Sequence, residues 1–238
     1  MADALEAAAR VRQAQPLVTA LADPDVRSAV AASLAAQVRA LHALDPAGIE
    51  ERDPLDYARA RFAEQRLRPG FPAWAAGLEP VLAGIEATLA RDPRRVVSHN
   101  DLNLGNVMWD GTRAWLIDWG QAGLAHPFYD LAVMALCLQL DDATAHSLLA
   151  LEQSQERGPQ PRSLDDCERE TFAAARRLAM LFYGIVNGSL VPDLGILPAS
   201  PPSVAACYAE RYAGRLSLHD VHDRATFAAA LLRAGIAP

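Results

Sequence analysis

Residues 97–107 read VSHNDLNLGNV, and residues 116–120 read LIDWG. The two stretches contain three hard oxygen donors, Asp101, Asn106 and Asp118. Apolar runs typical of short strands flank the first stretch, and Asp118 ends a second such run just before a glycine. We therefore expect the three side chains to converge. Carboxylate and amide oxygens suit Mg²⁺, which also binds substrate phosphates, and a remaining carboxylate can accept the proton of an attacking hydroxyl.

The surrounding chain is predicted to be mostly helical. Apolar residues recur every three or four positions from residue 26 to residue 44, with Asp23-Pro24 as the start signal and Asp45-Pro46 as the stop. Short strands are expected at 96–97, 107–109 and 114–117, with Asp110-Gly111 as the turn of a hairpin. Further helices are expected over 54–65, 72–91, 128–140, 165–186, 203–214 and 220–234, with a break near Pro80, loops at 158–161 and 197–202, and no sheet before residue 95.

The order of these residues resembles a known family. His-x-Asp-x-x-x-x-Asn over 99–106, followed by Ile-Asp-Trp-Gly over 117–120, is similar to the catalytic and metal loops of protein-kinase-like enzymes. More narrowly, the chain resembles the aminoglycoside phosphotransferase and choline kinase superfamily. HNDL at 99–102 is nearer the choline kinase branch, IDWGQAGLA at 117–125 is nearer the aminoglycoside branch, and YDLA at 129–132 matches both. Each piece alone is a weak signal, because Asp and Asn also serve as turn and cap residues.

The resemblance implies a role for each residue of the motif. Asp101 would be the catalytic base, and Asn106 and Asp118 would hold Mg²⁺ on the phosphates of ATP. His99 would pack under the catalytic loop as a structural residue. Asp130 would brace that loop by accepting backbone N–H bonds from the start of its helix. The implied activity is ATP- and Mg²⁺-dependent transfer of a phosphoryl group to a hydroxyl of a small molecule, such as an aminoglycoside or a compound like choline or ethanolamine.

Two residues are candidates for the acceptor pocket. Trp119 directly follows the metal-binding aspartate of the motif, and Asp141 offers a carboxylate to a cationic acceptor. For each of them the alternative is an ordinary surface or core position. Phe182 and Tyr183 lie in an apolar helix, and that setting favours packing over substrate binding.

The resemblance predicts an α+β, mainly helical fold, namely the C-terminal lobe of a protein-kinase-like phosphotransferase with a small central β-hairpin. One lobe would span residues 1–238, with a helical lead-in over 1–94, the catalytic and metal loops over 95–132, and a helical substrate-side region over 133–238. Such kinases carry an N-terminal β lobe with a glycine-rich loop and a lysine. All 22 basic residues here are arginine, and the early glycines are sparse.

We therefore expect the β lobe to be absent from this chain, and transfer by the chain alone to be slow or absent. A non-catalytic binding module and an N-terminally truncated remnant remain alternatives. An apolar face that the lobe would cover is expected to favour a homodimer.

Composition limits the partners. The net charge is −7, which disfavours a broad nucleic-acid surface. The first residues lack the apolar run of a signal peptide, and the longest apolar runs fall short of the roughly 18 residues of a membrane helix. Cys137, Cys167 and Cys207 are widely spaced and form no CxxC motif, as in reduced cytoplasmic proteins. The predicted partners are therefore a nucleotide and a small molecule in the cytoplasm, with no nucleic acid and no membrane.

Overall fold

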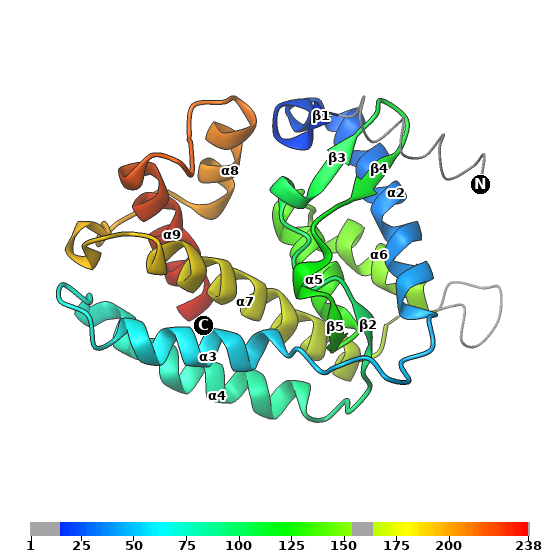
Figure 1. Cartoon of the computed structure of the whole chain (residues 1–238), viewed down its shortest axis with the longest axis horizontal. Coiled ribbons are helices and arrows are strands. Elements are labelled where there is room, and N and C mark those ends of the chain that lie inside the picture. The colour runs from blue at the N-terminus through cyan, green and yellow to red at the C-terminus, as the bar shows by residue number, and fades with distance from the viewer. Residues whose placement is uncertain (1–14, 154–163, 238) are drawn as a thin grey trace.

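The computed structural model describes residues 15–153 and 164–237, so the loop expected at 158–161 lies outside the described residues. Within this part of the chain the structure is mainly helical (Figure 1). Its α-helices are α2 (Pro24–His42), α3 (Pro54–Gln65), α4 (Leu78–Leu89), α5 (Phe128–Cys137), α6 (Asp142–Gln153), α7 (Asp166–Ser189), α8 (Val204–Tyr212) and α9 (Val221–Ile236). The expected mainly helical α+β fold is confirmed.

Aspartates begin several of these helices where the sequence places them. Asp23 accepts a 2.8 Å hydrogen bond from the Asp25 N–H, and Asp53 accepts one of 2.8 Å from the Leu55 N–H. In both helices proline follows the cap, where its missing N–H has no helical partner to lose. Asp165 and Glu168 form a capping box at the start of α7.

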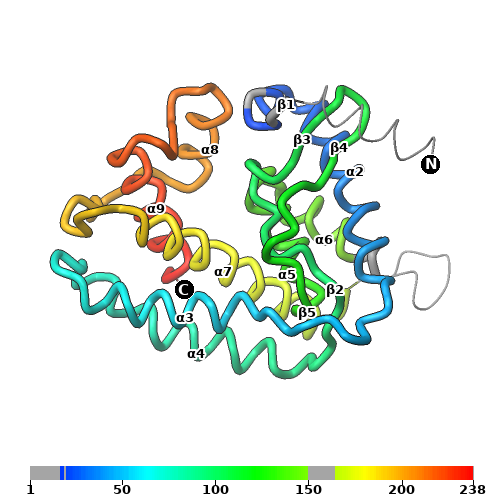
Figure 2. The backbone as a smooth tube through the Cα atoms, viewed as in Figure 1, coloured from blue at the N-terminus to red at the C-terminus, as the bar shows by residue number. Residues whose placement is uncertain are grey.

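Helix α7 is the central element of the core. It packs against α9 and α5 and, along another side, against α3 and α4. Figures 1 and 2 show it crossing the middle of the molecule, with α3 and α4 along one edge. Gly184 permits the close approach of α7 to α9, since a Cβ there would lie 2.8 Å from Cγ of Leu232. The apolar face of α7 is buried against all four neighbours, which makes this helix the scaffold of the fold.

Two small antiparallel sheets lie on the other side of α5 from α9. Strands β3 (Val107–Trp109) and β4 (Ala114–Leu116) form the expected hairpin, with Met108 opposite Trp115. β1 (Gln15–Pro16) pairs with β3 at the edge of this sheet. β2 (Val96–Ser98) pairs with β5 (Gly123–Ala125) in the second sheet. The hairpin therefore separates the two loops of the sequence motif.

The structure corrects three expectations of secondary structure. Strand β1 lies well before residue 95, where no sheet was expected, and its Pro16 is tolerated because the strand is at an edge. Pro80 does not break a helix, because it lies in the first turn of α4, where its missing N–H costs nothing. Helix α6 and strand β5 were not predicted. None of the described helices is both long enough and apolar enough to cross a bilayer.

Candidate functional site

The loop between β2 and β3 carries Asp101, and the Asp130 side chain anchors this loop by hydrogen bonds to its backbone. The backbone N–H of His99 donates to Asp130 Oδ2 at 2.8 Å, and that of Asn100 donates to Oδ1 at 3.0 Å. Asp130 is fully buried in the first turn of α5. Burial disfavours its charge, but His42 at 3.9 Å and the backbone N–H bonds hold the pKa of this carboxyl below its ordinary value. The donors to Asp130 thus come from the loop itself, whereas the sequence interpretation placed them at the start of its own helix.

His99 and Asn100 tie this loop to the segment that follows the hairpin. His99 is fully buried, and its Nε2 lies 3.1 Å from the carbonyl oxygen of Ile117, next to Asp118. Since a carbonyl only accepts, Nε2 carries the proton. Asn100 adopts a left-handed conformation with φ of 64°, and its side-chain amide donates to the Gln121 carbonyl at 3.2 Å. Both loops of the motif are therefore held as one unit.

Asp101 is held by three side-chain donors. Oδ1 accepts hydrogen bonds from the Asn103 amide at 2.7 Å and from the Tyr183 hydroxyl at 2.9 Å, and Oδ2 accepts one from the Asn106 amide at 2.7 Å. Burial and the nearby Asp101 charge raise the pKa of Tyr183 well above its ordinary value, so the phenol stays a donor. A carboxylate has about four acceptor sites. The oriented Asp101 carboxylate therefore retains capacity for the proton of a substrate hydroxyl.

The backbones next to Asn106 and Asp118 are joined at the open end of the hairpin. The Ile117 N–H donates to the Asn106 carbonyl at 3.0 Å, which places Asp118 beside Asn106. Asn106 uses its amide nitrogen on Asp101, and no described residue donates to its Oδ1. Asp118 is exposed, and its carboxylate accepts one long bond of 3.4 Å from the Gly120 N–H. One amide oxygen and one carboxylate with free acceptor sites suit a hard divalent cation that keeps some of its waters.

Asp118 also adopts an unusual backbone conformation. Its φ and ψ are 58° and 72°, in the left-handed region, although it is not glycine. The conformation costs about 1–2 kcal/mol for a residue with a Cβ. Asn100 shares this feature, so two of the three non-glycine residues with positive φ in the described chain lie in the two loops of the motif.

Two adjoining cavities open beside Asp101. The first, of about 340 Å³, is lined by Asp101, Asn103 and Tyr183 among others. The second, of about 420 Å³, is lined by Arg52, Asn100 and several carboxylates. Tyr57, Gln121 and Phe182 line both, so the two cavities adjoin, and we refer to them together as the hollow. The Tyr57 and Phe182 rings are 5.5 Å apart and form its aromatic wall.

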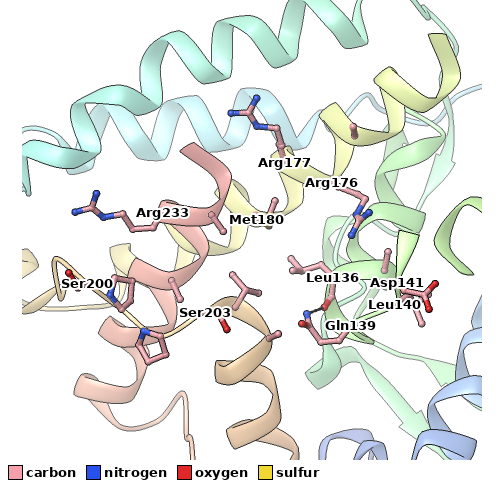
Figure 3. Close-up of a pocket in the computed structure, with 18 of the residues that line it drawn as sticks. Leu136, Gln139, Leu140, Asp141, Arg176, Arg177, Met180, Ser200, Ser203 and Arg233 are labelled. Carbon is pink, nitrogen blue, oxygen red and sulfur yellow. Dashed lines mark hydrogen bonds between the residues drawn. The ribbon is translucent and has the colours of Figure 1, made fainter. Parts of the chain in front are cut away.

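The two residues predicted for the acceptor pocket lie elsewhere. Trp119 is 49% exposed and its ring lies 4.6 Å from that of His99, but it lines neither cavity beside Asp101. Asp141 lines a different cavity, of about 910 Å³, formed by the end of α5, α7, α9 and the start of α8 (Figure 3). The structure therefore does not bring Asp141 together with Asp101. Tyr183, whose apolar setting favoured packing over substrate binding, contacts Asp101 directly.

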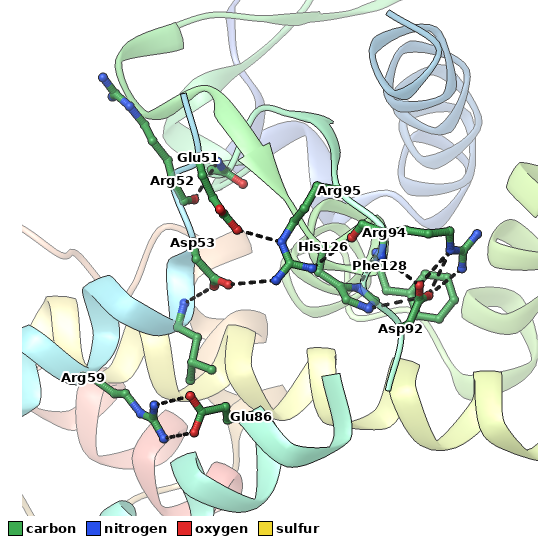
Figure 4. Close-up of polar contacts among 12 residues, drawn as sticks. Glu51, Arg52, Asp53, Arg59, Glu86, Asp92, Arg94, Arg95, His126 and Phe128 are labelled. Atoms are coloured by element: carbon green, nitrogen blue, oxygen red, sulfur yellow. Dashed lines mark hydrogen bonds and ion pairs between the residues drawn. The ribbon is translucent and has the colours of Figure 1, made fainter. Parts of the chain in front are cut away.

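Arg94 and Arg95 precede β2, close to the loop that carries Asp101, and both are held in ion pairs. Arg94 binds Asp92, with 2.6 Å between Nη2 and Oδ2 (Figure 4). Arg95 bridges Glu51, at 2.9 Å, and Asp53, at 3.7 Å. The two Arg95 pairs fasten the start of β2 to the chain before α3.

Sequence reasoning missed the contact of Tyr183 with Asp101, and it missed Tyr57 and the carboxylates of the second cavity. Tyr183 lies 82 residues from Asp101 in an apolar helix, and nothing in its local pattern distinguishes it from a core tyrosine. Tyr57 and Asp56 lie on α3, where their spacing is typical of an ordinary amphipathic helix. Among the site residues that were not predicted, Asn100 alone had a local signal. It lies inside the motif, and asparagine tolerates the left-handed backbone found there.

Comparison with solved structures supports the fold. A choline/ethanolamine kinase family protein from Mesorhizobium loti is 18% identical, with a TM-score of 0.59 over 91% of this chain and 70% of that one. The choline kinase LicA from Streptococcus pneumoniae is 14% identical, with a TM-score of 0.52 over 81% of this chain and 64% of that one. Choline kinase from Cryptosporidium parvum is 13% identical, with a TM-score of 0.53 over 80% and 64%. The chain thus spans about two thirds of the length of these proteins, and the likeness shows a shared protein-kinase-like fold.

Sequence comparison identifies the family. No curated protein matches the chain significantly. The family model described as the phosphotransferase enzyme family matches residues 4–166, which is more than half of the chain and includes both loops of the motif. With the fold in agreement, this protein belongs to the phosphotransferase enzyme family.

Proposed function

We propose that this chain binds Mg²⁺-ATP and a small hydroxyl compound, and that it transfers the γ-phosphoryl group between them. The observation that supports this most strongly is the Asp101 carboxylate, oriented by Asn103, Asn106 and Tyr183 at the edge of a hollow. Phosphoryl transfer depends mainly on positioning and on charge stabilisation. The Asp101 carboxylate, held rigidly beside a cavity, would supply the positioning.

In the proposed reaction Asp101 positions the acceptor hydroxyl and takes its proton. The hydroxyl oxygen bonds to the γ-phosphorus while the bond from that phosphorus to the β–γ bridging oxygen breaks, and ADP leaves. Asn106 Oδ1 and the Asp118 carboxylate would hold Mg²⁺, which supplies positive charge to the phosphate oxygens when bound. His99 and Asp130 would act by keeping the two loops together, and neither would touch the substrate.

The charge of the hollow favours a cationic acceptor. Four carboxylates line it, namely Glu51, Asp53, Asp56 and Asp101. They outnumber by one the arginines beside them, which are Arg52 and Arg211 in the lining and Arg95, paired with Glu51 and Asp53. Burial raises the pKa of the Asp53 carboxyl, and a bound cation would offset that burial cost. The faces of Tyr57 and Phe182 suit an ammonium group. We therefore propose an amine-bearing alcohol, such as an aminoglycoside or a choline-like compound.

The first test is the thermal stability of the purified chain with Mg²⁺-ATP. Nucleotide at about 100 times its Kd stabilises the folded state by roughly 2.7 kcal/mol, which is a rise of about 5–10 °C. The rise should disappear in Asp118→Asn and without Mg²⁺. A folded chain that shows no rise would instead favour the non-catalytic alternative, and ADP release in the presence of acceptors would separate an enzyme from a module that only binds.

The acceptor class is tested by Asp56→Asn, with Glu64→Gln on the same helix as the matched control. Asp56 lines the hollow, whereas Glu64 is paired with Arg61 on the outer surface of α3. Binding of choline, ethanolamine and a cationic aminoglycoside should weaken about three- to tenfold in the first variant only. Equal binding of an uncharged sugar by the unaltered chain would contradict the cationic class.

Self-association is a separate proposal. Leu44, Ile49 and Trp119 are large apolar side chains with 54%, 42% and 49% of their surface exposed. Burial of such residues favours a homodimer. Light scattering over a range of concentrations measures this directly, and a constant monomer mass would contradict it.

A further inference from the structure

The short segment between α2 and α3 runs extended beside β5. The Leu124 N–H donates to the Glu50 carbonyl at 2.8 Å, and the Arg52 N–H donates to the Leu124 carbonyl at 3.0 Å. In extended backbone, successive side chains point to opposite faces. Glu51 and Asp53 accordingly face Arg95, while the Arg52 side chain extends away from all three (Figure 4). Arg52 is thus directed out of the ion-pair network by the register of this segment.

Arg52 lies across the loop that carries Asp118. A Cβ on Gly123 would come within 2.8 Å of the Arg52 Cγ, so this glycine allows the arginine stem to rest on the backbone. The guanidinium donates to the carbonyl of Gly120, two residues after Asp118, with 2.5 Å between Nη1 and oxygen. The Arg52 carbonyl accepts the Asn100 side-chain amide at 3.1 Å. Both motif loops therefore hold Arg52 in place.

The Arg52 charge is only weakly compensated. Its side chain is 45% exposed, and its ion pair with Glu50 is long, at 3.9 Å, with a Glu50 side chain that is 85% exposed. A pair of this kind is easily exchanged for another partner. Arg52 also lines the cavity that adjoins the one beside Asp101. An arginine with spare donors thus lies beside both the candidate metal carboxylate and the hollow.

We propose that the Arg52 guanidinium binds the phosphate groups of the nucleotide and the phosphoryl group in transfer. This inference rests on the proposed function, and it adds the positive side chain which that function requires. The 238 residues contain no lysine, and Arg94 and Arg95 are held in ion pairs. Guanidinium groups match phosphate oxygens with two parallel donors, so a fixed arginine suits this task.

The test compares Arg52→Gln with Arg66→Gln. Glutamine retains most of the stem on Gly123 but removes the charge. Arg66 has a similar exposure, 53%, and pairs with Glu79 on the surface between α3 and α4. We expect Arg52→Gln to weaken Mg²⁺-ATP binding about tenfold in calorimetry, to leave the affinity for adenosine unchanged and to reduce the salt dependence of binding. Arg52→Lys should recover part of the loss, and Arg66→Gln should show none.

Each contrary result has a defined meaning. If Arg52→Gln is folded by circular dichroism and loses no more affinity than Arg66→Gln, or loses adenosine affinity equally, the inference is wrong. If Asp118→Asn abolishes Mg²⁺-ATP binding while Arg52→Gln retains it, the proposed function stands without Arg52. If the unaltered, folded chain binds no Mg²⁺-ATP, the proposed function is overturned and this inference with it.

Discussion

The hydroxyl of Tyr183 donates a 2.9 Å hydrogen bond to Oδ1 of Asp101, and the two residues are 82 positions apart in the chain. The bond joins the central helix α7 to the loop between β2 and β3. The set of three donors to the carboxylate is therefore complete only when α7 has packed against α5, because Tyr183 is placed by that packing. The core and the candidate site are thus coupled through one phenol.

Replacement of Tyr183 by phenylalanine tests this coupling. It removes one donor to a charged acceptor while the ring remains, so we expect phosphoryl transfer, measured as ADP release, to slow about tenfold with little change in acceptor KM. Tyr212→Phe is the control, because that hydroxyl donates to the Cys137 carbonyl and not to Asp101. Equal rates for Tyr183→Phe and the unaltered chain would show that Asp101 needs no help from α7.

The left-handed backbone at Asp118 predicts an inverted order of stability. Asp118→Gly should be more stable than Asp118→Ala by about 1 kcal/mol in urea unfolding, because glycine adopts a φ of 58° without a steric penalty. Both variants should lose the stabilisation by Mg²⁺-ATP. The same pair at Asp166, in the first turn of α7, should show the opposite order, since alanine is the better helix former. Alanine more stable than glycine at position 118 would argue against this conformation.

Asp130 is expected to contribute strongly to stability, because its carboxylate accepts two buried backbone hydrogen bonds. Asp130→Asn replaces one of two acceptor oxygens by an amide donor that faces a backbone N–H of His99 or Asn100. That backbone N–H would be buried without an acceptor, and the amide N–H group would face it donor to donor. We expect the free energy of unfolding to fall by about 2–4 kcal/mol. Asp45→Asn, at an exposed turn, is the matched control and should change it by less than about 0.5 kcal/mol. A loss below about 1 kcal/mol at Asp130 would contradict the anchoring role.

His126 makes stability depend on pH. Burial lowers the pKa of this histidine from 6.5 to about 4, and Asp92, 3.8 Å away, offsets only part of that effect. The unfolded chain therefore binds a proton more readily than the folded one, and stability is lost as the pH falls from about 6.5 to about 4. The loss attributable to His126 is at most roughly 3 kcal/mol.

Urea unfolding at several pH values measures this effect. His126→Gln should flatten the slope between pH 6.5 and pH 4, whereas the exposed His222→Gln should leave it unchanged. An unaltered slope in His126→Gln would mean that other groups cause the acid sensitivity.

Local pattern was sufficient for much of this fold. The helix starts at Pro24 and Pro54 follow from Asp-Pro pairs, and the β3–β4 hairpin follows from apolar runs on either side of Asp110-Gly111. In each case neighbouring residues decide the backbone, through caps and turns. Pro80 was misread because a proline ends a helix only in the interior, and local pattern does not tell whether Leu78 or Ala73 begins it.

The sequence alone determined which residues are candidates for the chemistry. Asp101, Asn106 and Asp118 lie within 18 positions of one another, and a hairpin that short-range signals define separates Asp118 from the other two. Only the tertiary structure decided what surrounds them. Tyr183 reaches Asp101 because α7 packs on α5, and Arg52 reaches the Asp118 loop because its segment pairs with β5. Trp119 and Asp141, chosen by adjacency and charge, line neither cavity beside Asp101. Side chains distant in sequence meet through packing and strand register, which depend on the whole core and leave no pattern in any short stretch of chain.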